Sequence, residues 1–156
     1  MRSDILVNSL KTDFPWVKFI EDSICKWSPD TGSVHYRPLK DRKDTWALLH
    51  ELSHAILGHF SFDRDIELIG KEVEAWQHAR DKLAPLYKLA IPDENIDSEL
   101  ETYREWLHSR SSCPVCELNG IQTEADTYRC LNCRTSWRVN DARRCELRRY
   151  TIKPLK

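Results

Sequence analysis

Residues 50–54, which read HELSH, match the HExxH pattern of zinc-dependent hydrolases. Residues four apart on an α-helix lie one turn apart on the same face. His50 and His54 can therefore offer two imidazole nitrogens to one Zn²⁺ at roughly 2.0–2.1 Å. Glu51, one position further round the helix, is the expected general base, which takes a proton from the attacking water. The spacing predicts a catalytic zinc site on this helix.

A third protein ligand is needed, because a catalytic zinc usually has three protein ligands and one open position. His59 lies five residues after His54, and on a continuous helix it would point about 140° away from it. It also misses the HExxHxxGxxH spacing by one residue, so we do not expect it to bind the metal directly. Glu72 and Glu74, on the helix that follows, both flank an apolar stripe, and periodicity alone does not choose between them.

Two CxxC pairs predict a second metal site of a different kind. Thirteen residues separate Cys116 from Cys130, which suits a compact zinc ribbon with tetrahedral Cys₄ coordination. A site closed by four sulfurs has a structural role, and metal binding would supply most of the folding energy of so short a module. The expected ligands are Cys113, Cys116, Cys130 and Cys133.

Charge is unevenly distributed along the chain. Residues 129–156 contain nine Lys or Arg and two acidic residues, a net of +7, whereas the whole chain carries −1. Aromatic residues interleaved with arginines suit stacking on bases and contact with phosphates, so DNA or RNA is an expected partner. A solvated basic tail and a docking surface for an acidic protein are the alternatives. The candidate nucleic-acid-binding residues are Arg134, Trp137, Arg138, Arg143 and Arg144.

Two neighbouring helices must position the catalytic residues, and a third helix is expected after them. The HExxH helix is expected to begin after an N-cap at Asp44 and to end at Gly58, with one broad apolar side facing a core. Apolar residues spaced by three or four predict further helices over residues 65–83 and 93–108.

Strands are expected only near the N-terminus and in the ribbon. β-Branched and aromatic residues over 14–37, with a turn signal at 29–32, predict a short antiparallel sheet. The expected fold class is α+β. A small zincin-like metallopeptidase domain would span residues 1–110, and a Cys₄ zinc ribbon with a basic tail would span 111–156.

Composition agrees with this organisation. The chain has 156 residues, of which 40% are hydrophobic and 31% charged, enough for a core in a soluble protein. There is no apolar run of the length that a signal peptide or a membrane span requires. We therefore expect a cytoplasmic protein with no membrane partner, in which the cysteines bind metal instead of forming disulfides.

The chain resembles the ImmA/IrrE family of zinc metallopeptidases in two motifs. These are HELSH at 50–54, with LGH at 57–59 behind it, and EVEAWQHA at 72–79, which is similar to the family's ExEAxxFA-like helix. The resemblance covers roughly residues 14–90. His78 departs from it, standing where the family tends to have phenylalanine, and the ribbon is not part of the usual pattern.

The resemblance implies a specific function and a specific ligand set. Glu74, the glutamate before alanine, would be the third zinc ligand beside His50 and His54. The activity would be proteolysis of a specific intracellular protein, such as a transcriptional regulator. The oxyanion would need a further donor, and the residues His35, Tyr36, His78 and Tyr103 stay unranked.

Two other interpretations remain open at this stage. A SprT-like protease that acts on DNA-bound proteins also joins HExxH to a zinc ribbon, although its third ligand is a later histidine. A non-enzymatic nucleic-acid or protein binding module would use zinc only structurally. A filled fourth ligand position would favour this last interpretation.

Overall fold

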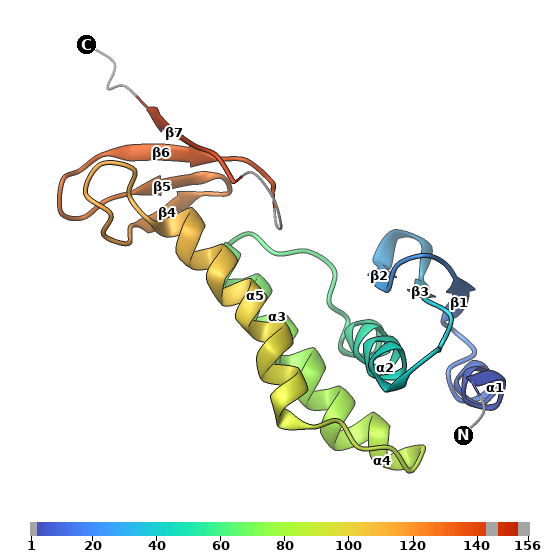
Figure 1. Cartoon of the computed structure of the whole chain (residues 1–156). Coiled ribbons are helices and arrows are strands. Elements are labelled where there is room, and N and C mark those ends of the chain that lie inside the picture. The colour runs from blue at the N-terminus through green and yellow to red at the C-terminus, as the bar shows by residue number, and fades with distance from the viewer. Residues whose placement is uncertain (1–2, 143–146, 153–156) are drawn as a thin grey trace. The chain divides into compact units, whose positions relative to one another are not determined.

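The computed structural model describes residues 3–142 and 147–152 and has the expected α+β class (Figure 1). The chain forms two compact units, one of Met1–Ser61 with Lys71–Ile96 and the other of Phe62–Gly70 with Asp97–Lys156. The boundaries of these units differ from those of the expected domains, 1–110 and 111–156. Residues 62–70 and the helical residues after 97 belong to the same unit as the ribbon.

A three-stranded sheet lies in the first unit. It is built from β1 (Lys18–Glu21), β2 (Lys26–Ser28) and β3 (Ser33–Tyr36), in the order β1-β3-β2. The turn predicted at 29–32 joins β2 to β3 as an antiparallel hairpin. The expectation of a wholly antiparallel sheet was wrong, however, because β1 pairs with the other edge of β3 in parallel.

The HExxH segment lies on α2 (Arg42–Leu57), which runs along β2 and β3. The helix begins earlier than expected: its N-cap is Asp41, whose carboxylate accepts a hydrogen bond from the Asp44 backbone N–H at 3.0 Å. Its end at Gly58 is confirmed, and the glycine has the left-handed φ of 68° that ends many helices. The buried apolar residues of α2 are Leu48, Leu49, Leu52 and Ala55.

Other helices complete this core. α1 (Ser3–Asp13) precedes the sheet, and α3 (Asp65–His78) follows α2. The expected helix over 65–83 changes character at its end, where Ala79–Leu83 forms a π-helical turn before the short α4 (Ala84–Leu86). The buried apolar side chains from the part of α3 in this unit and from the turn after it are Ala75, Trp76, Ala79 and Leu83.

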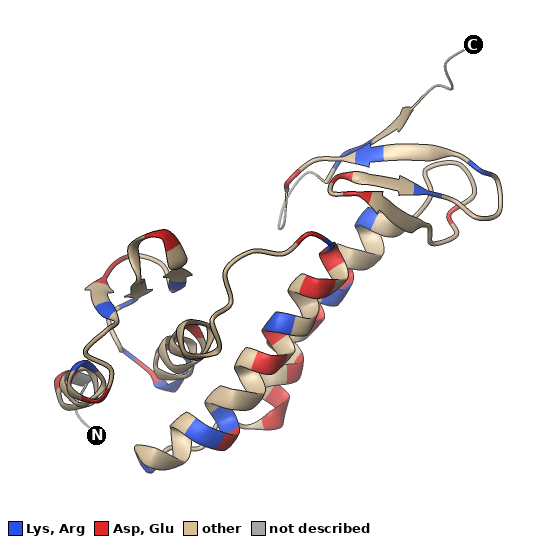
Figure 2. Ribbon diagram, turned by 180° about the vertical axis from the view of Figure 1, so that it is seen from behind, with Lys and Arg blue, Asp and Glu red and all other residues tan. Residues whose placement is uncertain are grey.

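The longest helix of the described chain is α5 (Asp93–Ser111), with 19 residues. Acidic residues, coloured red in Figure 2, recur along its sequence and keep its mean hydropathy low. None of the helices in the described part of the chain combines the length and the apolar character needed to cross a bilayer.

The second unit contains the ribbon sheet. Its strands β4 (Ile121–Glu124), β5 (Thr127–Arg129), β6 (Ser136–Val139) and β7 (Arg149–Ile152) are all antiparallel and follow chain order. The core of this sheet consists of two ring side chains stacked at 5.8 Å, two cysteines and a valine: Tyr128, Trp137, Cys113, Cys130 and Val139.

A buried ion pair joins this sheet to the end of α5. Arg110 Nε donates to Asp65 Oδ2 at 2.6 Å, and the Tyr128 hydroxyl donates to the same oxygen at 2.5 Å. The Trp137 indole N–H donates to the Arg110 carbonyl at 2.9 Å. A buried carboxylate and guanidinium are tolerated only when paired and hydrogen-bonded in this way. The network therefore fixes the ribbon to the helix that leads into it.

The N-cap of α2 can be tested by substitution. Asp41→Ala removes the acceptor for the Asp44 N–H and should destabilise the protein by about 1 kcal/mol. Urea unfolding followed by far-UV circular dichroism measures this loss. Asp41→Ser keeps a capping oxygen and should lose much less, so equal losses in the two variants would show that the cap contributes nothing.

Candidate metal centres

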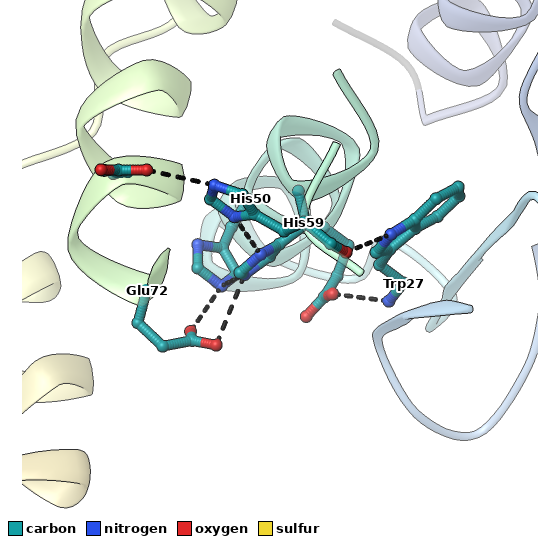
Figure 3. A network of polar contacts seen from close by, with 7 residues as sticks. Trp27, His50, His59 and Glu72 are labelled. Carbon is teal, nitrogen blue, oxygen red and sulfur yellow. Dashed lines mark hydrogen bonds and ion pairs between the residues drawn. The ribbon is translucent and has the colours of Figure 1, made fainter. Parts of the chain in front are cut away.

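Three buried side chains of the first unit converge on one point. His50 and His54 come from α2, and Glu72 comes from α3 (Figure 3). The His50 Nε2 atom lies 3.1 Å from His54 Nε2 and 3.1 Å from Glu72 Oε2. The His54 Nε2 atom lies 3.5 Å from Glu72 Oε1. One nitrogen of each ring and the carboxylate therefore face the same small volume.

The spacing and chemistry of these donors fit a zinc ion. Ligands bound at about 2.0–2.1 Å to one tetrahedral ion lie roughly 3.3–3.4 Å apart, close to the three separations measured. Burial alone would raise the pKa of Glu72, but its contacts with His50 and His54 outweigh burial and hold that pKa well below its usual value. The carboxylate is therefore charged at neutral pH, as a metal ligand must be.

The expected third residue, Glu74, does not join this cluster. Its side chain is 66% exposed, and its carboxylate lies 3.2 Å from His59 Nε2. Residues two apart on a helix point about 200° apart, so Glu72 and Glu74 cannot face α2 together. The apolar stripe held the signal that could have chosen between them. Glu72 lies three and four residues before the buried Ala75 and Trp76, and thus on their face.

Glu51 points toward the sheet. Its Oε2 atom accepts a hydrogen bond of 2.6 Å from the Trp27 backbone N–H on β2. The Trp27 indole N–H donates in turn to the His59 carbonyl at 2.9 Å, as Figure 3 shows. Sequence reasoning missed Trp27 as a residue of the site, because a main-chain donor leaves no signal in residue type.

The candidate oxyanion donors make other contacts. His78 Nδ1 lies 3.0 Å from Ser53 Oγ, and since that hydroxyl donates to the Leu49 carbonyl, it accepts from His78. Tyr36 is buried in the core, and Tyr103 belongs to the other unit. The structure therefore gives no support to His78, Tyr36 or Tyr103 as the oxyanion donor.

His35 has the surroundings of a serine-hydrolase histidine but cannot act as one. Its Nδ1 atom lies 2.8 Å from Asp22 Oδ2, and its Nε2 atom lies 3.2 Å from Ser33 Oγ. This order of groups is that of a catalytic triad. Ser33 has no exposed surface, however, so no substrate can reach its hydroxyl. The three residues form a polar network between β3 and the residue that follows β1.

The four predicted cysteines form the second cluster. In each CxxC pair, the N–H of the residue after the second cysteine donates to the carbonyl of the first: Glu117 to Cys113 at 3.0 Å and Arg134 to Cys130 at 3.1 Å. Glu117 and Arg134 have left-handed φ angles of 62° and 63°. The two loops thus have the same backbone geometry, which turns both sulfurs of each pair inward.

The four sulfur atoms lie as close together as ligands of one ion. Cys113 Sγ is 3.5 Å from Cys133 Sγ, and Cys116 Sγ is 3.4 Å from Cys130 Sγ. Hydrogen bonds with the side chain and backbone of Thr135 lower the pKa of Cys133 to about 6, which favours the thiolate that binds metal. The described chain therefore holds two candidate metal sites, Cys₄ and His₂Glu.

The candidate nucleic-acid residues differ in exposure in the described ribbon. Trp137, expected to stack on bases, is fully buried, so that expectation was wrong. Arg138 is exposed and pairs with Asp126 at 2.6 Å, and Arg134 is exposed. Arg143 and Arg144 lie outside the described residues. Four acidic residues accompany five arginines in the described ribbon, and Figure 2 shows the two signs intermixed.

Comparisons with known proteins add no assignment. No family model, no curated protein and no solved structure matches the chain. The resemblance to the ImmA/IrrE family stays a prediction from two motifs. Inference about function therefore depends on the geometry of the two sites.

Replacing each glutamate in turn tests the choice between Glu72 and Glu74. Glu72→Gln removes a side chain that would bind zinc directly. Loss of a residue that only hydrogen-bonds to a ligand costs roughly 10–100-fold in affinity, so Glu72→Gln should weaken zinc binding at the His₂Glu site by more than that. Glu74→Gln should stay within that range. Competition with a chelator, after the Cys₄ site is filled, measures both. A larger loss in Glu74→Gln would restore Glu74 as the ligand.

Loss of the cysteine cluster should unfold the ribbon and leave the His₂Glu site intact. Cys130→Ser removes one of four thiolates and should release that metal and unfold the ribbon, since metal binding supplies folding free energy in such modules. Metal content by mass spectrometry reports the loss of the ion, and a red shift of tryptophan fluorescence, to which the buried Trp137 contributes, reports the unfolding. Cys25→Ser, in the other unit, is the matched control and should keep both metals.

Proposed function

We propose that this protein is a zinc-dependent peptidase. The observation that carries the proposal is the buried His50, His54 and Glu72 cluster on two adjacent helices, with Glu51 beside it in the sequence. Three protein donors are the usual number in catalytic zinc sites, whereas structural sites use four. Among the described residues this cluster has three and the cysteine cluster has four.

The residues around the site have distinct roles in hydrolysis. When bound, zinc supplies Lewis acidity that polarises a carbonyl and makes water more acidic. Glu51 receives a hydrogen bond at one carboxylate oxygen from the Trp27 N–H, which fixes its orientation. The other oxygen is left to accept a proton from the attacking water and to pass it to the leaving amine.

The edge of the sheet supports a peptide as the substrate. In the order β1-β3-β2, strand β2 is an edge strand. The Trp27 N–H donates to Glu51, so this edge strand directs a backbone group toward the proposed base. An extended peptide that adds to such an edge is held by main-chain hydrogen bonds, so its scissile bond can lie near Glu51.

The alternatives have less support. A SprT-like ligand set needs a third histidine, whereas the third group here is the Glu72 carboxylate. A nucleic-acid-binding ribbon loses its proposed stacking residue because Trp137 is buried. We assign the ribbon the task of recruiting an intracellular protein substrate, such as a transcriptional regulator.

Glu51→Gln separates metal binding from hydrolysis. The variant keeps His50, His54 and Glu72, so its zinc content should be unchanged, but loss of the base should lower cleavage by about 100–10,000-fold. Mass spectrometry of new termini in a peptide library measures cleavage. Glu94→Gln, on the exposed first turn of α5, is the control. Undiminished cleavage by Glu51→Gln would remove the proposed base, and zinc binding without cleavage by the wild type would favour a binding module.

A further inference from the structure

His59 lies behind His54, on the side away from Glu72. The left-handed Gly58 turns the chain back after α2, and the His59 backbone N–H donates to the His54 carbonyl at 3.0 Å. On a continuous helix His59 would point away from His54, but α2 ends at this glycine and the turn brings the two rings together. The main chain of His59 is also held by the Trp27 indole at its carbonyl.

The side chain of His59 bridges two residues. Its Nδ1 atom lies 2.9 Å from His54 Nδ1, and its Nε2 atom lies 3.2 Å from Glu74 Oε2. The ring is largely buried, while Glu74 reaches it from the exposed side of α3. The three residues form a chain of contacts from the candidate metal site to the surface.

One assignment of protons satisfies every contact in this chain when His54 is a metal ligand. The Nε2 atom of His54 must then present a lone pair to the metal, so its proton is on Nδ1. The Nδ1 atom of His59 must accept that proton's hydrogen bond, which places the His59 proton on Nε2. That N–H is then directed at the Glu74 carboxylate. Two facing ring nitrogens need one proton between them, and Glu74 decides which ring supplies it.

We infer that His59 is a positioning residue that holds His54 in the tautomer and orientation required for metal binding, with Glu74 as its anchor. The inference rests on the proposed metal site and deepens it. Glu74 thereby has a role at the site without touching the metal. Hydrogen-bonded partners of metal-bound histidines commonly fix the ring in this way and raise its basicity.

The two ligand histidines are held by different means. His50 stacks on Trp76 with ring centroids 4.2 Å apart, and its Nδ1 atom has no hydrogen-bond partner in the described structure. His54 has a polar partner at the corresponding nitrogen. Loss of His59 should therefore affect His54 and leave the ring of His50 in place.

Two substitutions of different chemistry test this inference. His59→Leu removes the acceptor, whereas His59→Asn places an amide oxygen near the position of Nδ1. We expect zinc affinity at the His₂Glu site to fall by about 10–100-fold in His59→Leu and to recover to within a few-fold in His59→Asn. Competition with a chelator measures affinity on the full chain, with thermal unfolding as the check on folding.

A spectroscopic measurement separates positioning from mere packing. In the zinc-loaded wild type, long-range ¹H–¹⁵N correlation spectra should show His54 with its proton on Nδ1, and the His59→Leu spectrum should show that signal altered. Unchanged affinity and an unchanged His54 signal in His59→Leu would overturn the inference. Equal losses in His59→Leu and His59→Asn would also overturn it, since only packing would then matter.

Failure of the metal site itself would look different. If zinc binding is insensitive to Glu72→Gln as well as to both His59 variants, the proposed ligand set is wrong, and the inference about His59 falls with it. If Glu72→Gln loses zinc while His59→Leu does not, the site stands and only the positioning role is rejected.

Discussion

A charged carboxylate inside an apolar core is the constraint around which the first unit is organised. Glu72 is only 6% exposed, and an unpaired carboxylate in that position would cost several kcal/mol. The two imidazoles of α2 are its only partners among the described residues, which ties the position of α3 to that of α2. Stacking of His50 on Trp76 adds an apolar contact between the same two helices. The same residues that form the candidate metal site therefore also hold α2 and α3 together.

The left-handed turn at Gly58 extends this arrangement to the sheet. It places His59 between His54 and Glu74, and it offers the His59 carbonyl to the Trp27 indole. Trp27 in turn holds Glu51 through its backbone N–H. One residue of the edge strand therefore contacts the proposed base and the segment that supports a proposed ligand. Chemistry and substrate binding would share this strand, which is why its open edge matters to the proposed peptidase.

The ribbon is stabilised by a different set of interactions. Two loops that share the same hydrogen bond and the same left-handed residue direct four sulfurs to one point, and Cys113 and Cys130 are buried beside the stacked rings. The buried Asp65 and Arg110 satisfy each other and receive hydrogen bonds from Tyr128 and Trp137. Trp137, the candidate for stacking on bases in the sequence, is needed for this internal network. Composition indicated a nucleic-acid surface, but burial removes Trp137 from it.

The sequence alone determined the features that depend on local spacing: the histidine pair of HExxH, the four cysteines, the end of α2 at Gly58 and the α+β class. These follow from helical repeat and turn chemistry, which act over a few residues. Tertiary structure alone decided that β1 pairs in parallel and that His59 reaches back to His54. It also places Glu72 and not Glu74 against the imidazoles, a choice for which the apolar stripe of the helix held a signal in the sequence. These features depend on how elements that are distant in the sequence meet in space. On a helix, a shift of one or two residues is enough to move a side chain from one face to another.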